Sequence, residues 1–304
     1  MTPAAEKTPL LFAFQELPLQ QPLCDRLRAQ VGQLESRYFP DGESYVRVLS
    51  DVVGRHCLLL ADLSHPDDRY LPLIFLADTL RDLGAASVGL VAPYLCYMRQ
   101  DARFQSGEAI TSKIFARSLS AHIDWLVTVE PHLHRFRSLD QLYSVPSRVV
   151  QAAPALVEWL GQRRHLLLVG PDAESEQWVA EIARRSGHPY VIGRKERLGD
   201  RHVRVTLPPV EQYDDRVAVI IDDVISSGHT ILKCLQALEA GGIEQVECVA
   251  VHGIFADESD AQLVGAGLAG LVTTNTVPHA TNDIDVSPLL APAIQACLKA
   301  ARET

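Results

Sequence analysis

Residues Arg216 to Ala240 read RVAVIIDDVISSGHTILKCLQALEA, and this stretch decides the fold. Its first part, Val217 to Ile221, is a continuous β-branched and apolar run of the kind that forms a buried strand in a parallel sheet. The run stops at the acidic pair Asp222 and Asp223, and a helix with apolar residues on one face follows. The sequence therefore predicts a strand, a short loop and a helix in direct succession, the repeating unit of an α/β sheet.

The loop between this strand and helix has the composition of a phosphate cradle. Small residues, hydroxyls and backbone N–H groups lie directly before the helix, in the run Ser226, Ser227, Gly228, His229 and Thr230. The N-terminus of a helix carries unpaired N–H donors and a positive partial charge, and glycine permits the tight turn that points them at an anion. The acidic pair would repel a phosphate, so we expect it to face sugar hydroxyls or Mg²⁺. The same residues also suit a solvated strand end and an ordinary connection with Thr230 as N-cap.

Composition and charge exclude several classes of protein. The length of 304 residues predicts about two domains. A formal net charge of -10 argues against general nucleic-acid binding, which needs an extended basic face. Because no apolar run spans a bilayer and the N-terminus lacks a signal pattern, we expect a cytoplasmic protein without a membrane partner. The six cysteines are scattered singly, which predicts reduced, mostly buried thiols.

Polar clusters follow predicted strands in the first half of the chain. The turn FPDGE at 39–43 places an aromatic ring beside two carboxylates, which suits a planar base, although such a turn is more often a plain hairpin. In the loop 97–108, Arg99 suits phosphate oxygens and Gln100 a base or ribose, and a solvated loop fits as well. The motif EPHLH at 130–134 offers metal-ligand types, but no further close ligand follows it.

The second half of the chain repeats the alternation of strands and helices. Asp172 follows a strand and opens a helix, where it suits an N-cap as well as a metal or sugar ligand. Four cations lie within residues 194–201, which suits a mobile lid over phosphates as well as a solvated charge run. The proline-bearing segment 143–153 separates the halves. We therefore predict two open α/β domains with largely parallel sheets, over residues 1–148 and 149–304.

Taken together and in this order, the motifs resemble those of the ribose-phosphate pyrophosphokinases over nearly the whole chain. The matching segments are FPDGE (39–43), YMRQDARF (97–104), VTVEPHLH (127–134), VGPDA (169–173), KER (195–197) and IIDDVISSGHT (220–230). Each motif is weak alone, but all of them in register form a specific pattern. The form RFxxGEAIxSK from Arg103 to Lys113, with the DDVISS loop, resembles the archaeal-type members more than the common bacterial class.

The resemblance implies transfer of the pyrophosphoryl group of ATP to the anomeric hydroxyl of ribose 5-phosphate, giving phosphoribosyl pyrophosphate and AMP for nucleotide biosynthesis. It also implies domains of phosphoribosyltransferase-like type, Mg²⁺ as cofactor and a homo-oligomer, with the ATP side in the first domain and the ribose 5-phosphate side in the second. The site residues that it implies are Phe39, Asp41, Glu43, Arg99 and Gln100 for ATP; Asp222, Asp223, Ser226, Ser227, Gly228, His229 and Thr230 for ribose 5-phosphate; His132 and Asp172 for the metal; and Lys195 and Arg197 on a catalytic lid.

Departures from the family pattern leave alternative functions open. The usual D-T-G-G-T phosphate loop reads Ser226 to Thr230 here, so that His229 takes a glycine position. His229 must then adopt an ordinary φ/ψ and point away, or contact the phosphate as a cation. The alternatives are a phosphoribosyltransferase that consumes phosphoribosyl pyrophosphate and a catalytically silent, regulatory homologue. The N-terminal motifs argue against the first, and the retained lid cations and acidic pair argue against the second.

Overall fold

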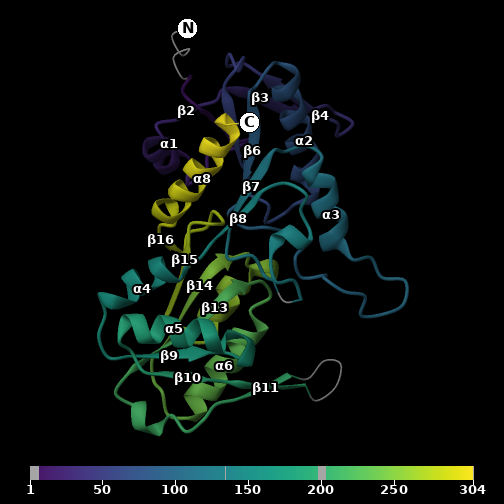
Figure 1. Ribbon diagram of the computed structural model, residues 1–304. Coiled ribbons are helices and arrows are strands. Elements are labelled where there is room, and N and C mark those ends of the chain that lie inside the picture. Colours follow the sequence, from purple (N-terminus) through teal and green to yellow (C-terminus); the bar gives the residue numbers. More distant parts are fainter. Residues whose placement is uncertain (1–6, 134, 198–202, 304) are drawn as a thin grey trace. The chain divides into compact units, whose positions relative to one another are not determined.

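The computed structural model describes residues 7–133, 135–197 and 203–303 (Figure 1). The chain divides into two compact units, one made of Met1–Gln151 with Val286–Thr304 and the other of Ala152–Asp285. Each unit contains a six-stranded sheet in which every neighbouring pair of strands is parallel. The predicted α/β class with two parallel sheets is therefore confirmed.

The sheet of the first unit has the strand order β2-β1-β5-β6-β7-β8. Its strands are β1 (Leu10–Phe12), β2 (Gln30–Val31), β5 (His56–Leu60), β6 (Ser87–Val91), β7 (Trp125–Val129) and β8 (Ser147–Val150). Every residue of β6 and β7 is buried, because helices cover both faces of a parallel sheet. This double burial explains why both strands appear in the sequence as continuous apolar runs.

In the described part of the first unit, α-helices and a hairpin accompany the sheet. The helices are α1 (Gln20–Leu27), α2 (Asp67–Asp82), α3 (Thr111–Ser120) and α8 (Ser287–Arg302), with a short 3-10 turn η1 (Leu139–Gln141). The hairpin consists of the antiparallel strands β3 (Leu34–Tyr38) and β4 (Ser44–Val48). The Tyr38 hydroxyl donates to the backbone oxygen of Asp68, 3.2 Å away, and so ties the hairpin to α2. The FPDGE turn is thus the tip of a hairpin, as its turn chemistry predicts.

The sheet of the second unit has the strand order β10-β9-β13-β14-β15-β16. Its strands are β9 (Leu166–Gly170), β10 (Tyr190–Ile192), β13 (Val217–Ile225), β14 (Val246–Gly253), β15 (Gly270–Thr274) and β16 (Asn282–Ile284), and a separate antiparallel ribbon pairs β11 (Arg194–Arg197) with β12 (Val203–Thr206). The helices and 3-10 turns are α4 (Ala153–Gly161), η2 (Ala173–Ser175), α5 (Glu176–Ser186), η3 (Glu211–Tyr213), α6 (His229–Ala240), η4 (Ala256–Glu258) and α7 (Ser259–Gly265).

The structure differs from the predicted elements around the junction of the two halves. The segment expected to separate the halves contains the strand β8. Pro146, directly before this strand, lacks an N–H but keeps its backbone oxygen, which accepts a hydrogen bond from the Leu126 N–H at 3.0 Å. The proline therefore does not prevent pairing with β7. The last helix, assigned to the second domain by the sequence, belongs to the first unit. There the Arg26 Nε donates to the Ser287 hydroxyl at 3.0 Å, and the buried face of α8 includes Leu290.

Two further findings concern the second half and the cysteines. Strand β13 does not stop at the acidic pair, because Asp222 pairs with Ala250 and Val224 with His252 in the ladder to β14.

All six cysteines are free and buried, as predicted, and burial raises the pKa of Cys57 to about 12. In the part of the chain that the structure describes, no helix combines the length and the apolar character needed to cross a bilayer.

Candidate functional site

The loop from Ser226 to Gly228 connects β13 to α6 at the carboxyl end of the second sheet. Gly228 is the N-cap of α6 and has a left-handed backbone with φ of +69°. Since the helix begins at His229, Thr230 lies inside its first turn and is not the N-cap. Glycine has no side chain to cap the helix, and the first N–H groups of a helix have no intrahelical acceptor. The loop therefore has the donors that a phosphate requires.

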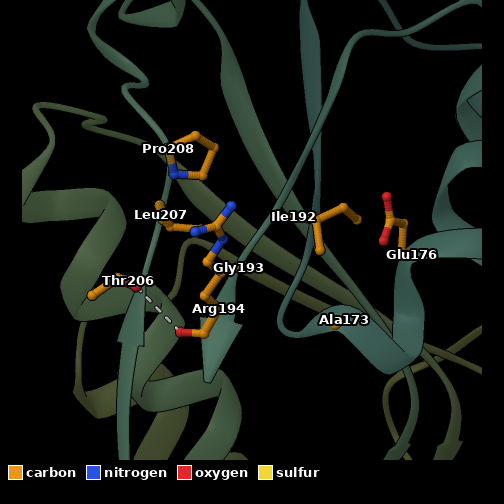
Figure 2. Close-up of a pocket in the computed structure, with 8 residues that line it drawn as sticks. All are labelled: Ala173, Glu176, Ile192, Gly193, Arg194, Thr206, Leu207 and Pro208. Carbon is orange, nitrogen blue, oxygen red and sulfur yellow. Dashed lines mark hydrogen bonds between the residues drawn. The ribbon is translucent and has the colours of Figure 1, made fainter. Parts of the chain in front are cut away.

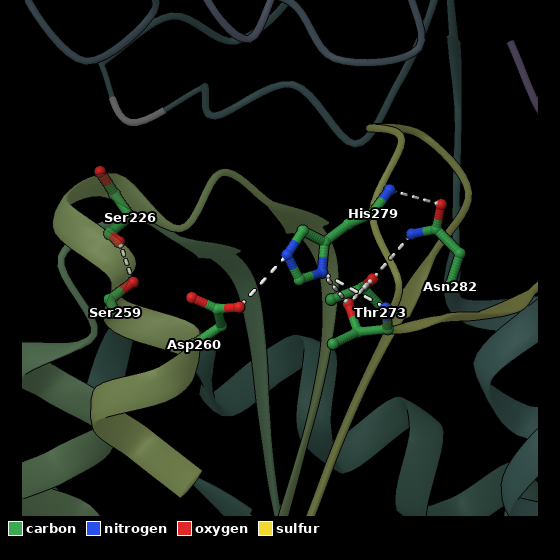
Figure 3. Close-up of polar contacts among 7 residues, drawn as sticks. Ser226, Ser259, Asp260, Thr273, His279 and Asn282 are labelled. Atoms are coloured by element: carbon green, nitrogen blue, oxygen red, sulfur yellow. Dashed lines mark hydrogen bonds and ion pairs between the residues drawn. The ribbon is translucent and has the colours of Figure 1, made fainter. Parts of the chain in front are cut away.

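The loop is supported from one side by α7. The Ser259 hydroxyl donates to the backbone oxygen of Ser226 at 2.7 Å (Figure 3). A Cβ atom placed on Gly228 would lie 3.3 Å from both Ser259 Cβ and Leu263 Cδ1. The space beneath Gly228 is thus already filled, and any larger residue there would have to displace the loop or α7.

His229 stands where the family usually has a glycine, and its backbone conformation is ordinary. It is the first residue of α6, has no left-handed φ, and is exposed. The replacement therefore costs no backbone strain, and the residue that requires glycine is Gly228. His229 thus has the ordinary backbone conformation that the sequence requires of it, and its exposed side chain is accessible at the start of the helix.

The acidic pair forms a carboxylate cluster with Asp172. Asp222 and Asp223 are only partly exposed, and the Asp223 N–H donates to Asp222 Oδ1 at 3.0 Å. Burial raises the pKa of Asp222 well above its usual value, and the negative charges of Asp223 and Asp172 raise it further. Such a cluster favours a divalent cation or hydroxyl donors, so the residues present fit Mg²⁺. Across the described ranges, no group of three or more His, Cys, Asp or Glu is placed so that it could hold a metal ion. This does not argue against Mg²⁺, which usually takes one or two carboxylates plus substrate phosphates.

Asp172 is held in place by the turn that follows β9. Its Oδ1 accepts hydrogen bonds from the backbone N–H of Glu174 at 3.1 Å and of Ser175 at 3.3 Å. The Ser175 hydroxyl in turn donates to the backbone oxygen of Asp172 at 2.7 Å. The N-cap role anticipated for Asp172 is therefore confirmed, and it fixes this carboxylate at the carboxyl end of β9.

A cavity of about 550 Å³ lies beside the Asp172 turn (Figure 2). Its lining residues are Ala173, Glu176, Ile192, Gly193, Arg194, Thr206, Leu207 and Pro208. A Cβ on Gly193 would lie 2.6 Å from the backbone oxygen of Pro171, so only glycine permits this close approach of two chain segments. Among the described side chains, the cavity is lined by the carboxylate of Glu176 and the guanidinium of Arg194. It therefore lies between Asp172 and the start of the β11–β12 ribbon.

The predicted lid residues Lys195 and Arg197 both lie in β11, where they pair with Val205 and Val203 of β12. Their backbone is described, but their side chains are outside the description, as are residues 198–201 of the same cationic run. The ribbon thus places the two residues on one strand, directly after the cavity-lining residue Arg194.

In the first unit, the hairpin tip gathers the predicted adenine-binding residues. The Phe39 ring is 39% exposed and meets Tyr45 edge to face, with ring centroids 5.9 Å apart. The Arg37 guanidinium lies 4.5 Å from the centroid of the first ring and 4.4 Å from that of the second. The Glu43 N–H donates to Asp41 Oδ1 at 3.2 Å, so the aromatic ring and both carboxylates share one short exposed turn.

The loop after β6 is ordered by its own hydrogen bonds. The Glu108 Oε2 accepts from the Phe104 N–H at 2.7 Å, and Gln100 Oε1 accepts from the Thr111 hydroxyl at 3.1 Å. Gln100 is therefore held at the start of α3, while Arg99 beside it is exposed. His132 follows β7 and is partly exposed, and His134 of the same motif lies outside the described residues.

Sequence reasoning missed the residues that support the phosphate loop from α7 and beyond. Ser259 lies 33 residues from Ser226, and Asp260 and His279 continue the same set of contacts. No spacing or motif links these positions, because the contacts form only when β14, α7 and β15 pack side by side. The structure alone brings them together.

Comparison with known proteins agrees with this arrangement. A family model described as the N-terminal domain of ribose phosphate pyrophosphokinase matches residues 10–122, and a phosphoribosyl transferase domain matches residues 138–264. The ribose-phosphate pyrophosphokinase of Methanopyrus kandleri is 31% identical over 277 residues, which cover 90% of this chain and 94% of that protein. The chain belongs to the ribose-phosphate pyrophosphokinase family.

Further relatives in the ribose-phosphate pyrophosphokinase family support the same placement. The protein of Saccharolobus solfataricus is 33% identical over 271 residues, covering 85% of this chain and 90% of its own. The curated relatives are mostly archaeal, which confirms the archaeal-type form of the motifs. The crystal structure of phosphoribosylpyrophosphate synthetase from Mycobacterium smegmatis has a TM-score of 0.82 over 96% of this chain and 99% of that chain, at 24% identity, and has the same fold.

Proposed function

We propose that this member of the ribose-phosphate pyrophosphokinase family transfers the pyrophosphoryl group of ATP to the anomeric hydroxyl of ribose 5-phosphate. The products are phosphoribosyl pyrophosphate and AMP. The observation that carries the proposal is the uncapped N-terminus of α6 at Gly228, which follows the carboxylate cluster of Asp222 and Asp223 at the end of one strand. A phosphate site and a site for hydroxyls therefore lie side by side, as ribose 5-phosphate requires.

The sugar side of the reaction belongs to the second unit. The N–H groups from Ser227 to Thr230 bind the 5-phosphate, and the hydroxyls of Ser226, Ser227 and Thr230 add donors. The exposed imidazole of His229 lies at the rim of this loop, where it contributes a further donor. Asp222 and Asp223 accept hydrogen bonds from the ribose hydroxyls and so orient the anomeric oxygen. Orientation matters here because pyrophosphoryl transfer depends on alignment rather than on a strong nucleophile.

Mg²⁺ is the cofactor that we assign to the carboxylate cluster. The raised pKa of Asp222 shows that ionising this group is costly beside Asp223 and Asp172, and a bound dication offsets that cost. We assign Asp172 of the second unit and His132 of the first unit to positioning Mg²⁺ ions, each in its own unit and together with the substrate phosphates. When bound, Mg²⁺ supplies positive charge to the phosphate oxygens on which negative charge accumulates.

ATP binds on the side of the first unit in this proposal. Phe39 stacks on the adenine ring, and Asp41 and Glu43 accept hydrogen bonds from its amino group. Arg99 binds phosphate oxygens and Gln100 binds the nucleotide next to it. Because the chain carries a net charge of -10, such local cations are needed to hold the ATP phosphates.

The β11–β12 ribbon acts as the lid in this proposal. Lys195 and Arg197 bring cations to the transferring phosphoryl group, and closure over the neighbouring cavity excludes the water that would hydrolyse ATP. We further propose a homo-oligomer, in which the hairpin tip completes the ATP site of a second copy. The buried free thiols suit a reducing compartment, so we place the protein in the cytoplasm.

A product assay tests the proposal. The purified protein is mixed with ATP, Mg²⁺ and ribose 5-phosphate, and AMP and phosphoribosyl pyrophosphate are expected in equal amounts. Leaving out ribose 5-phosphate is the control, and it should abolish AMP formation. The absence of both products despite ATP binding would favour the silent homologue. Formation of a nucleotide from phosphoribosyl pyrophosphate and a free base would favour the transferase, which has no use for the ATP residues of the first unit.

A further inference from the structure

The connection from β14 to α7 contains a cluster of strained backbone conformations. Three non-glycine residues have left-handed φ values there, namely Phe255 (50°), Asp257 (54°) and Glu258 (57°). This conformation costs energy for any residue with a Cβ atom, so it persists only where the surroundings impose it. The Gln262 side chain supports the middle of this connection by donating to the backbone oxygen of Asp257 at 2.6 Å.

Both ends of this connection hold the phosphate loop. At its start, the N–H groups of Ile254 and Phe255 donate to the backbone oxygen of Ile225, at 2.8 and 3.2 Å. At its end, the Ser259 hydroxyl donates to the backbone oxygen of Ser226 at 2.7 Å. Two consecutive carbonyls at the start of the loop, those of Ile225 and Ser226, are therefore held by the strained connection, and a shift of the connection would move the loop.

His279 clamps the two ends of the connection to each other. Its ring lies 4.4 Å from the ring of Phe255, centroid to centroid, at an interplanar angle of 44°. Its Nε2 lies 3.4 Å from the Asp260 carboxylate, next to the serine that holds the loop (Figure 3). The side chain of His279, from the loop between β15 and β16, thus contacts Phe255 at the start of the strained connection and Asp260 just after its end.

A chain of hydrogen bonds fixes the orientation of this imidazole. The Thr281 N–H donates to His279 Nδ1 at 3.3 Å, and the other ring nitrogen, Nε2, faces the Asp260 carboxylate. The Thr281 hydroxyl lies 3.0 Å from the same nitrogen and 2.8 Å from the Thr273 hydroxyl. The Asn282 amide donates to Thr273 Oγ1 at 2.9 Å and so anchors the whole chain on β15.

We infer that His279 is a positioning residue for the ribose 5-phosphate loop, acting through Phe255 and Asp260 and touching no substrate itself. This inference rests on the proposed function. Without the clamp, the strained connection relaxes and the carbonyls of Ile225 and Ser226 lose their fixed donors. The affinity for ribose 5-phosphate then falls, whereas the ATP side in the first unit is unaffected.

A double-mutant cycle tests the inference, with His279→Ala, Asp260→Ala and the double variant. Isothermal titration of ribose 5-phosphate with Mg²⁺ gives the affinity without depending on turnover, and steady-state kinetics give the KM of each substrate. We expect each single variant to weaken ribose 5-phosphate binding by roughly tenfold, with the double variant no weaker than the worse single one. The KM for ATP should stay within about twofold, which a general structural defect would not produce.

Two further variants keep the test decisive. His279→Phe retains the ring contact and loses the N–H, so it should weaken binding less than His279→Ala, and it replaces the latter in the cycle if that variant fails to fold. His188→Ala is the matched control, because His188 is a partly exposed histidine of the same unit that contacts the Leu160 oxygen and not the loop connection.

The outcomes separate the inference from the function on which it rests. A wild-type protein that binds no ribose 5-phosphate would overturn the proposed function, whatever His279 does. Wild-type binding that His279→Ala and Asp260→Ala leave intact would overturn only the inference. The inference would also be overturned if the variants weakened the binding of both substrates equally, or if His188→Ala weakened ribose 5-phosphate binding as much as His279→Ala does.

Discussion

Gly228→Ala tests whether the left-handed glycine before α6 forms the phosphate site. Its φ of +69° costs a residue with a Cβ atom about 1–2 kcal/mol. The new methyl group would also lie 3.3 Å from Ser259 Cβ and Leu263 Cδ1, which adds up to about 1 kcal/mol of crowding. We expect the melting temperature to fall by about 2–4 °C for each kcal/mol lost. We also expect ribose 5-phosphate to bind at least roughly tenfold more weakly, because relieving the crowding turns the N–H groups away from the phosphate.

Gly242→Ala supplies the matched control for this experiment. Gly242 also has a left-handed φ, of +89°, but nothing lies within 4 Å of a Cβ built on it, and it follows the other end of α6. It should therefore lose about 1–2 kcal/mol of stability without any change in ribose 5-phosphate affinity. Calorimetric scans and isothermal titration of both variants give the comparison. Equal affinities in the two variants would refute the argument, because backbone strain alone would then explain every effect at Gly228.

Three more predictions follow from the proposed site. Lys195→Ala should lower kcat by roughly 100-fold or more with little change in the KM for ATP, since the lid acts in the transition state; an unchanged kcat removes Lys195 from the mechanism. Phe39→Ala should raise the KM for ATP while the KM for ribose 5-phosphate and the melting temperature stay nearly constant, because the ring is 39% exposed; an unaltered KM for ATP refutes the stacking role. Asp222 has a raised pKa, so its stabilising contribution is complete below the ordinary aspartate pKa of about 3.9 and is lost as pH rises through the higher folded value. Asp222→Asn should therefore raise the melting temperature above that of the wild type at neutral pH without Mg²⁺, while lowering activity. Calorimetric scans of both proteins from about pH 4 to pH 8 check this, and a variant that melts below the wild type at neutral pH would contradict the sign.

The central strands of both sheets could be predicted from sequence because they are buried on both faces. The apolar runs that became β6, β7, β9 and β14 need no knowledge of their neighbours. The edge strands β8 and β16 were missed, since a short strand such as Asn282–Ile284 is defined by pairing with β15 rather than by its own composition. The placement of α8 in the first unit was missed for the same reason, because it depends on packing against α1.

The candidate site was predictable only as far as its motifs reach along the chain. The acidic pair and the loop before α6 are contiguous in sequence, and their chemistry could be assigned from residue types. The strict need for glycine at Gly228, and the harmless exposure of His229, depend on backbone angles that no pattern specifies. His279 lies outside every motif, so its role follows only from the contacts with Phe255 and Asp260.

The energetic cost of the site is concentrated at one end of the second sheet. The partly buried carboxylate of Asp222, in the last part of β13, and the left-handed connection from Phe255 to Glu258, directly after β14, both oppose folding. These two strands are also the longest of their sheet and are buried over most of their length, so the core imposes the unfavourable conformations instead of yielding to them. Mg²⁺ and ribose 5-phosphate would remove the electrostatic part of this cost on binding, because each supplies the charge or the hydroxyl donors that the cluster lacks. Mg²⁺ should consequently strengthen the binding of ribose 5-phosphate, because it neutralises carboxylate charge that would otherwise repel the phosphate. By linkage, ribose 5-phosphate should strengthen the binding of Mg²⁺ by the same factor.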